Sequence, residues 1–167
     1  MVIRFEAAEE GDAEALARVQ KAAFDSQVPP ERPDLGGPPG YDAPEWQRET
    51  MREAPYFRVL RDGEIVGGIV LRLPEPGHVH VERVFLHPDH HGAGIGTRAF
   101  AWLEATHPHV ALWTLRTPAF HTRNQRLYER LGYRRTGEVE VFPGFSLVEY
   151  EKRIGDGDGG LRPGRGG

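Results

Sequence analysis

The 167-residue chain contains no cysteine. Disulfide bonds, thiolate zinc sites and a cysteine nucleophile are therefore excluded. It has no run of about 18 apolar residues, so we expect no membrane-spanning segment. It also lacks a long basic run and its net charge is −4, which argues against a nucleic-acid-binding protein. The first residues include Arg4, Glu6, Glu9 and Glu10, which is unlike a secretory signal, and we expect a cytoplasmic protein.

Residue patterns predict an α/β chain with a mixed sheet and helices on its faces. Length and composition favour a single domain over residues 1–154, followed by a disordered glycine-rich tail over 155–167. Asp12 is predicted to cap a helix whose inner face carries Leu16, Val19 and Ala23. Further helices are expected over 45–53, 94–106 and 123–131, and strands over 2–6, 57–60, 65–73, 78–86, 110–116, 133–141 and 145–153.

A segment rich in proline and glycine separates the first two predicted helices, from Ser26 to Ala43. It is too long to be a simple connection, and loops of this length are often functional. A flexible insertion without a role is an equally good interpretation. Tyr41 and Trp46 are candidates to line a substrate pocket, whereas Trp113 in a central strand is expected in the core.

The segment from Val84 to Thr97 is the most informative part of the chain. An apolar strand leads into Pro88, and glycines follow at Gly92, Gly94 and Gly96 before a helical pattern begins. Alternate glycines let backbone N–H groups face one point, and the helix N-terminus adds its own free N–H groups. This order of elements predicts a site for a phosphate or pyrophosphate.

Two familiar glycine motifs do not fit this segment. The phosphate loop of nucleotide hydrolases ends in Gly-Lys-Ser/Thr, but Gly96 is followed by Thr97 and Arg98. The dinucleotide motif G-x-G-x-x-G fails because the glycines are spaced by two throughout. A glycine turn without a ligand stays open as an alternative. The histidines at 87, 90 and 91 have no carboxylate pair at ligand spacing beside them, so we expect no metal site.

Two segments resemble the GNAT family of N-acetyltransferases. His91-Gly92-Ala93-Gly94-Ile95-Gly96 is similar to the acetyl-CoA turn of the family, usually written Q/R-x-x-G-x-G/A, except at its first position. The run from Asn124 to Tyr133 resembles the family's N-x-x-x-x-Y-x-x-x-G-[FY] helix. The resemblance covers residues 2 to 153. It implies the GNAT fold: a mixed, mostly antiparallel sheet of about seven strands flanked by about four helices.

The resemblance implies an enzyme that moves an acetyl group from acetyl-CoA to a primary amine of a small molecule or peptide, without a metal. Acetyl-CoA is thus the implied cosubstrate and the amine the implied partner, and a homodimer through the last strands rests on analogy alone. His91, in place of Gln or Arg, is expected to weaken cofactor binding or make it pH-dependent. The implied cofactor-binding residues are Val84, Phe85, Leu86, His91, Gly92, Ala93, Gly94, Ile95, Gly96, Thr97, Asn124 and Tyr128.

The implied catalytic roles fall to few residues. A backbone N–H between Val84 and Leu86 is expected to stabilise the oxyanion, and Tyr128 to protonate the leaving thiolate. Glu82, acting through a water, is the first candidate for the base and His80 the second, because His78, His80 and Glu82 alternate on one strand face. The alternative is that all three are ordinary surface residues.

Two other functions stay open at this point. One is a GNAT-fold module that binds acetyl-CoA or CoA as a sensor and transfers nothing. The other is a nucleotide-binding domain unrelated to CoA. The nature of the acceptor amine and the oligomeric state are not readable from the sequence.

Overall fold

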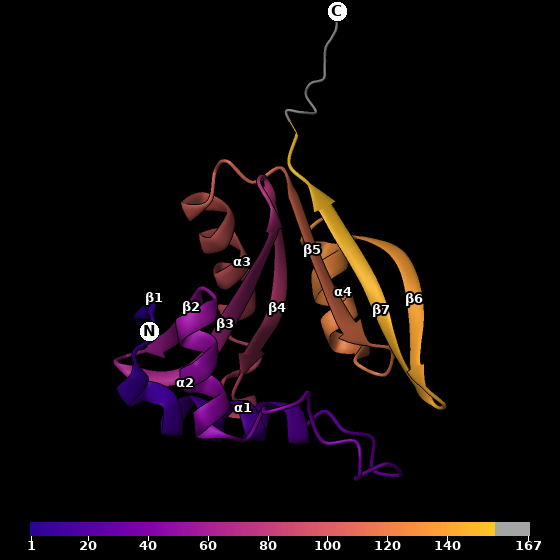
Figure 1. Ribbon diagram of the computed structural model, residues 1–167, viewed down its shortest axis with the longest axis horizontal. Helices are drawn as coiled ribbons and strands as arrows, with labels where there is room; N and C mark the ends of the chain where they lie inside the picture. Colours follow the sequence, from indigo (N-terminus) through magenta and orange to yellow (C-terminus); the bar gives the residue numbers. More distant parts are fainter. Residues whose placement is uncertain (156–167) are drawn as a thin grey trace, which may run out of the picture. The chain divides into compact units, whose positions relative to one another are not determined.

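The computed structural model describes residues 1–155, and seven β-strands and four α-helices lie within them (Figure 1). The order of elements is the predicted one. The N-terminal elements are β1 (Ile3–Ala7), the 3-10 turn η1 (Glu10–Asp12), α1 (Ala13–Asp25), α2 (Pro44–Glu53), β2 (Tyr56–Arg61) and β3 (Glu64–Glu75). There follow β4 (His78–Leu86), the 3-10 turn η2 (Pro88–His90), α3 (Ile95–Thr106), β5 (Leu112–Pro118), α4 (Thr122–Arg130), β6 (Arg134–Phe142) and β7 (Phe145–Arg153). Beyond Gly155, the segment predicted to be disordered lies outside the described residues.

The strands are joined in the order β1-β2-β3-β4-β5-β7-β6. The β1–β2, β2–β3, β5–β7 and β6–β7 pairs are antiparallel, and β4–β5 is parallel. The predicted mixed, mostly antiparallel sheet is therefore confirmed. The described residues group into two compact units, one with residues 1–71 and 82–102, the other with residues 72–81 and the chain from Leu103 onward. Both β3 and β4 contribute residues to each unit. That residues 1–154 form a single domain stays a prediction.

In the first unit, α1 buries the face that its sequence predicts. Leu16, Val19 and Ala23 are at most 7% exposed and pack in one cluster with Val70 and Phe85. Their spacing of three and four residues places all of them on one side of the helix. α1 is therefore held to β3 and β4 by apolar burial.

Asp12 occupies the N-cap position of α1, as predicted, but its side chain makes no capping hydrogen bond to that helix. The chain makes a 3-10 turn first, and Asp12 already has helical backbone angles (φ −85°, ψ −7°). Its carboxylate turns back to accept a hydrogen bond from the backbone N–H of Glu9 at 2.8 Å, and it also pairs with Arg58 at 3.0 Å. Glu9 caps the 3-10 turn in this capping box.

A buried polar network connects α1, α2 and the strands of the first unit. Gln20, Gln47 and Arg83 are at most 6% exposed. The amide nitrogen of Gln20 donates to Gln47 Oε1 at 3.2 Å, and the Tyr56 hydroxyl donates to the same oxygen at 2.5 Å. Arg83 on β4 donates from Nη1 to Gln20 Oε1 at 2.7 Å. Buried polar groups that satisfy one another in this way specify a single packing arrangement.

The same network holds the end of the segment 26–43. Arg83 Nη2 donates to the carbonyl of Pro39 at 2.6 Å, and its guanidinium lies 3.8 Å from the centre of the Trp46 ring. Gln47 Nε2 donates to the carbonyl of Gly40 at 3.2 Å. A Cβ on Gly40 would lie 2.2 Å from the Trp46 ring, and Gly40 has φ +77°, so only glycine fits there. Trp46 thus contacts Arg83 and the loop, as the anchor of α2.

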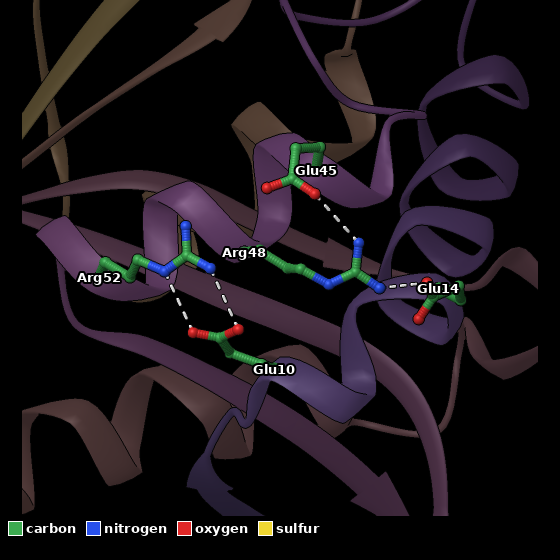
Figure 2. Close-up of polar contacts among 5 residues, drawn as sticks. All are labelled: Glu10, Glu14, Glu45, Arg48 and Arg52. Carbon is green, nitrogen blue, oxygen red and sulfur yellow. Dashed lines mark hydrogen bonds and ion pairs between the residues drawn. The ribbon is translucent and has the colours of Figure 1, made fainter.

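Exposed ion pairs connect the other side of α2 to η1 and α1. Figure 2 shows Arg52 of α2 donating to both carboxylate oxygens of Glu10, each at 3.1 Å. It also shows Arg48 between Glu14 of α1 and Glu45 of its own helix. These side chains are partly or largely in solvent, which screens their charges, so each pair contributes little to stability. Burial of the apolar and polar groups on the inner side of α2 therefore matters more.

The second unit has its own core around β5 and β7. Trp113, Leu115, Val148 and Tyr150 are at most 2% exposed, which confirms the core position expected for Trp113. The strand predicted over 110–116 instead spans Leu112–Pro118, because the backbone N–H of Val110 closes a turn onto the carbonyl of His107 at 3.2 Å. Figure 1 shows β6 and β7 as a long hairpin ending the described chain.

β6 ends the strand order, so one of its edges has no neighbouring strand in the described chain. Its burial pattern shows eight exposed residues of nine. The register with β7 is interrupted twice, between Arg135 and Gly137 and between Glu140 and Phe142. Irregularities of this kind bend a strand and increase its twist.

Candidate functional site

The end of β4 is positioned by two glycines of β3. A Cβ on Gly67 would lie 2.3 Å from the carbonyl oxygen of Phe85, and one on Gly68 would lie 2.4 Å from the Phe85 ring. Phe85 is 5% exposed and packs in the core cluster of the first unit, whereas Val84 and Leu86 are half-buried. The absence of side chains at Gly67 and Gly68 therefore lets β4 approach β3 closely and fixes the path of residues 84–86.

The connection from β4 to α3 is a sequence of hydrogen-bonded turns. The N–H of His87 donates to the carbonyl of Val66 at 2.8 Å, and the N–H groups of His90 and His91 donate to the carbonyls of His87 and Pro88. Gly92 (φ +81°) and Gly94 (φ +78°) then have left-handed backbone angles, which strongly favour glycine. A Cβ at either position would meet no atom within 4 Å, so this side of the turn is open.

α3 begins directly after the turn, at Ile95. Ile95 is 2% exposed and anchors the helix, whereas Thr97 and Arg98 are exposed. The first N–H groups of a helix have no intrahelical acceptor, and they carry the positive end of its dipole. Residues 92–97 thus combine an open glycine turn with a helix N-terminus, which is the arrangement that binds phosphate oxygens.

The side chain of His91 forms a hydrogen bond to the backbone within this turn. Its Nε2 lies 3.1 Å from the carbonyl oxygen of Leu86. A carbonyl only accepts, so Nε2 carries the proton and donates it across the turn. From the sequence, the side chain of residue 91 is expected to act as a hydrogen-bond donor. In the structure the His91 side chain donates to the backbone at the end of β4.

Asn124 and Tyr128 lie on α4, in the second unit. Asn124 is half-buried in the first turn of the helix. Tyr128 is 4% exposed, and its ring contacts those of Tyr133 and Tyr150 at 6.1 and 5.9 Å between centroids. Burial, with a smaller effect of Tyr150, raises the pKa of Tyr128 above that of an ordinary phenol. The phenol is therefore uncharged over the range of pH in which enzymes are assayed.

His78, His80 and Glu82 alternate along β4 as the sequence predicts, and the two histidines share a partner. His78 Nε2 and His80 Nδ1 lie 2.7 and 2.9 Å from the hydroxyl oxygen of Thr114 on β5. Both rings are half-buried, whereas Glu82 is exposed. The Thr114 hydroxyl can donate to only one ring, so it orients the pair and links their tautomers.

The sequence profile of the acetyltransferase (GNAT) family matches residues 16–133. The matched range contains both the glycine turn and α4. This chain belongs to the GNAT family. The predicted N-acetyltransferase and GNAT fold are thereby confirmed at the level of the family and the architecture.

Relatives of this GNAT protein include two from Bacillus subtilis strain 168. The uncharacterised protein YrkN is 36% identical over 76 residues, which are 45% of this chain and 41% of YrkN, so the match spans about two fifths of that relative. An S-(2-succino)cysteine N-acetyltransferase is 31% identical over 119 residues, 64% of this chain and 70% of that protein. The crystal structure of the PaiA N-acetyltransferase of Thermoplasma acidophilum with coenzyme A has a TM-score of 0.76 at 17% identity, covering 92% of this chain and all of that one, and shows the shared fold.

The structure shows one buried ionisable residue of this GNAT protein that the sequence did not identify. His121 precedes α4, is 7% exposed, and its Nδ1 is buried without a hydrogen-bond partner among the described residues. Burial lowers the pKa of His121 to about 4, so its ring is neutral. Its edge contact with Phe120 and its burial depend on tertiary packing, for which a lone histidine gives no sequence signal.

The predicted site residues of this GNAT chain thus fall into two sets. The first unit holds Glu82 and residues 84–86 and 91–97, and the second holds His80, Asn124 and Tyr128. Among residues 1–155, no group of three or more His, Asp or Glu side chains is placed to hold a metal ion. No helix in that part of the chain is long and apolar enough to span a membrane.

Proposed function

We propose that this GNAT protein transfers the acetyl group of acetyl-CoA directly to a primary amine. The observation that supports this best is the open turn with Gly92 and Gly94 at positive φ, leading into the N-terminus of α3. Within this family, that arrangement suits the pyrophosphate of coenzyme A. The N–H groups of residues 92–97 would bind its oxygens.

The strand end 84–86 would bind the rest of the cofactor. The parallel register of β4 with β5 runs from His78 to Val81, so residues 84–86 lie beyond it. Their backbone groups would pair with the amides of the pantetheine arm like an additional strand. One N–H of this segment would stabilise the oxyanion that forms when the amine attacks the thioester carbon. Asn124 is proposed as a further polar contact to the cofactor.

Tyr128 would assist departure of the thiolate when the carbon–sulfur bond breaks. Its buried phenol is protonated at rest, and its pKa is raised. A simple thiol has a pKa of about 8.5, so full proton transfer from this phenol to a thiolate is uphill. A hydrogen bond to the developing thiolate is therefore the role we propose for Tyr128.

The attacking amine must lose a proton in the same reaction. His80 Nδ1 lies 2.9 Å from the Thr114 hydroxyl oxygen, whereas Glu82 is exposed. Both remain proposed bases, with Glu82 acting through a water. Because one relative is an S-(2-succino)cysteine N-acetyltransferase, we propose an amino-acid-like primary amine as the acceptor, and that compound is the first to test.

The proposal is tested first by binding and then by turnover. Calorimetric titration should show one site for acetyl-CoA and for CoA, and none of comparable affinity for ATP or NAD. Gly94→Val should abolish this binding because it strains a left-handed residue and fills the open side of the turn, whereas Gly11→Val, at another glycine with no atom within 4 Å, should keep it. Undiminished acetyl-CoA affinity in Gly94→Val would contradict the placement of the turn.

Turnover separates an enzyme from a silent binding module. Release of free thiol from acetyl-CoA should depend on an added amine, and Tyr128→Phe should lower kcat by roughly tenfold or more while leaving the cofactor Kd unchanged. Unchanged kcat in Tyr128→Phe would exclude the proposed role of the hydroxyl. Tight cofactor binding without transfer to any amine in the panel would leave the module as the correct description.

A further inference from the structure

A cavity of about 390 Å³ lies in the first unit, between α1, the start of β3 and η2. Its floor is apolar, with Val19 of α1 and Val66 of β3 both at least nine-tenths buried and Ile65 half-buried. A cavity of this volume is within the range of small-ligand sites. None of the proposed cofactor-binding residues lines it.

Side chains of opposite charge line this cavity and form no ion pair with each other. Arg18 of α1 and Glu64 of β3 are exposed, and neither forms an ion pair with any other residue of the described chain. Asp89 of η2 adds a second carboxylate, with its side chain 84% exposed and 3.8 Å from His87 Nδ1. Two carboxylates beside one guanidinium would repel a multiply charged anion, whereas a molecule carrying both charges matches them.

Two histidines add hydrogen-bond donors to the same cavity: His87 directly before η2 and His90 at its end. His87 Nδ1 accepts the backbone N–H of Asp89 at 3.1 Å, and His90 Nδ1 lies 3.0 Å from Nη1 of Arg61. A guanidinium only donates, so both Nδ1 atoms are acceptors and the proton of each neutral ring is on Nε2. Each imidazole therefore retains an Nε2–H that these bonds do not use.

The geometry points to a binding site for a small α-amino acid with an apolar side chain. The ligand's carboxylate would bind Arg18 and the imidazole N–H groups, its ammonium would bind Glu64, and its side chain would cover Val19 and Ile65. Because η2 leads directly into the glycine turn, a ligand held by His87 and His90 would also stabilise the start of that turn. The site is separate from the proposed function, since no step of acetyl transfer uses it.

The test needs neither acetyl-CoA nor an acceptor. Two-dimensional NMR of the full chain would follow the side-chain signals of His87, His90 and Val19 during additions of L-valine, glycine, acetate and methylamine. We expect saturable shifts with L-valine at a Kd of about 1 mM, several-fold weaker binding of glycine, and no saturation with acetate or methylamine alone. Absence of L-valine shifts up to about 10 mM, or equal binding of acetate, would overturn the proposal.

Charge variants assign the ligand's two ends. Arg18→Gln and Glu64→Gln should each weaken L-valine binding about tenfold or more, since each removes one charged contact. Arg126→Gln is the matched control, because Arg126 is another exposed helix arginine that forms no ion pair in the described chain. Arg18 and Glu64 are exposed, so the variants should fold, and an unchanged spectrum elsewhere would verify it. Equal L-valine affinity in all three variants would also refute the site.

Discussion

Acid should destabilise this protein through His121 in a way that can be measured at a single residue. In the unfolded chain its imidazole has the ordinary pKa of 6.5, whereas burial lowers the pKa in the folded protein to about 4. Between these two pH values, His121 is protonated in the unfolded chain and neutral in the folded protein. The contribution of His121 to the free energy of unfolding is therefore fully present above pH 6.5. It decreases as the pH drops from 6.5 to about 4, and below that pH His121 causes no further loss.

The size of the effect follows from the two pKa values. At about 1.4 kcal/mol for each unit of pKa, the difference corresponds to about 3 kcal/mol. His121 is 7% exposed, so solvent screening reduces this figure little. A loss of this size is a large part of the roughly 5–15 kcal/mol that separates the folded from the unfolded state of a typical protein.

Urea denaturation at a series of pH values between about 7.5 and 4.5 would measure it. Other histidines and carboxylates titrate in the same range, so the readout is the difference in pH slope between the natural protein and His121→Asn. Asn cannot titrate, and its amide replaces Nδ1. His109→Asn, at an exposed histidine of the same unit, should leave the slope unchanged. Equal slopes for the natural protein and His121→Asn would refute the argument.

Three further substitutions compare a buried arginine with two exposed ones by urea denaturation. Arg83→Met should lower the free energy of unfolding by about 3 kcal/mol, because it leaves the buried oxygens of Gln20 and Pro39 without their charged donor. Arg116→Met, which removes an exposed pair with Glu149, should cost less than about 1 kcal/mol, and similar losses for the two variants would contradict the ranking. Arg52→Gln should lower the free energy of unfolding slightly at low salt and leave it unchanged near about 1 M salt, where exposed pairs are screened; a salt-independent loss would show that the pair with Glu10 is not acting as an exposed ion pair.

The sequence predicted features whose cause is local. Asp62-Gly63 is a dipeptide typical of a tight turn between two strands, and both residues have positive φ in the β2–β3 turn. The inner face of α1 followed from the spacing of Leu16, Val19 and Ala23. The glycine turn was also readable, because Gly92 and Gly94 need backbone angles that few other residues adopt.

Features that depend on distant residues were not predictable in the same way. Asp12 occupies the N-cap position of α1, as its residue type predicts, but its carboxylate binds the backbone N–H of Glu9 and the side chain of Arg58, which lies 46 residues further on. Arg83 reads as one polar residue in a strand, although it connects α1, the loop and Trp46. The burial of His121 likewise results from tertiary packing, because its neighbours in sequence do not define its surroundings.

The irregular course of β6 has a consequence for how this protein behaves at high concentration. An exposed, straight edge strand is a template on which another chain can pair and begin to aggregate. Here Val139, Val141 and Phe142 are 40–52% exposed, which would favour such pairing. The two breaks in register distort the edge, and Glu138 and Glu140 alternate with Val139 and Val141. An open hairpin with three exposed apolar side chains is thus protected from fibril-like growth by its own distorted backbone.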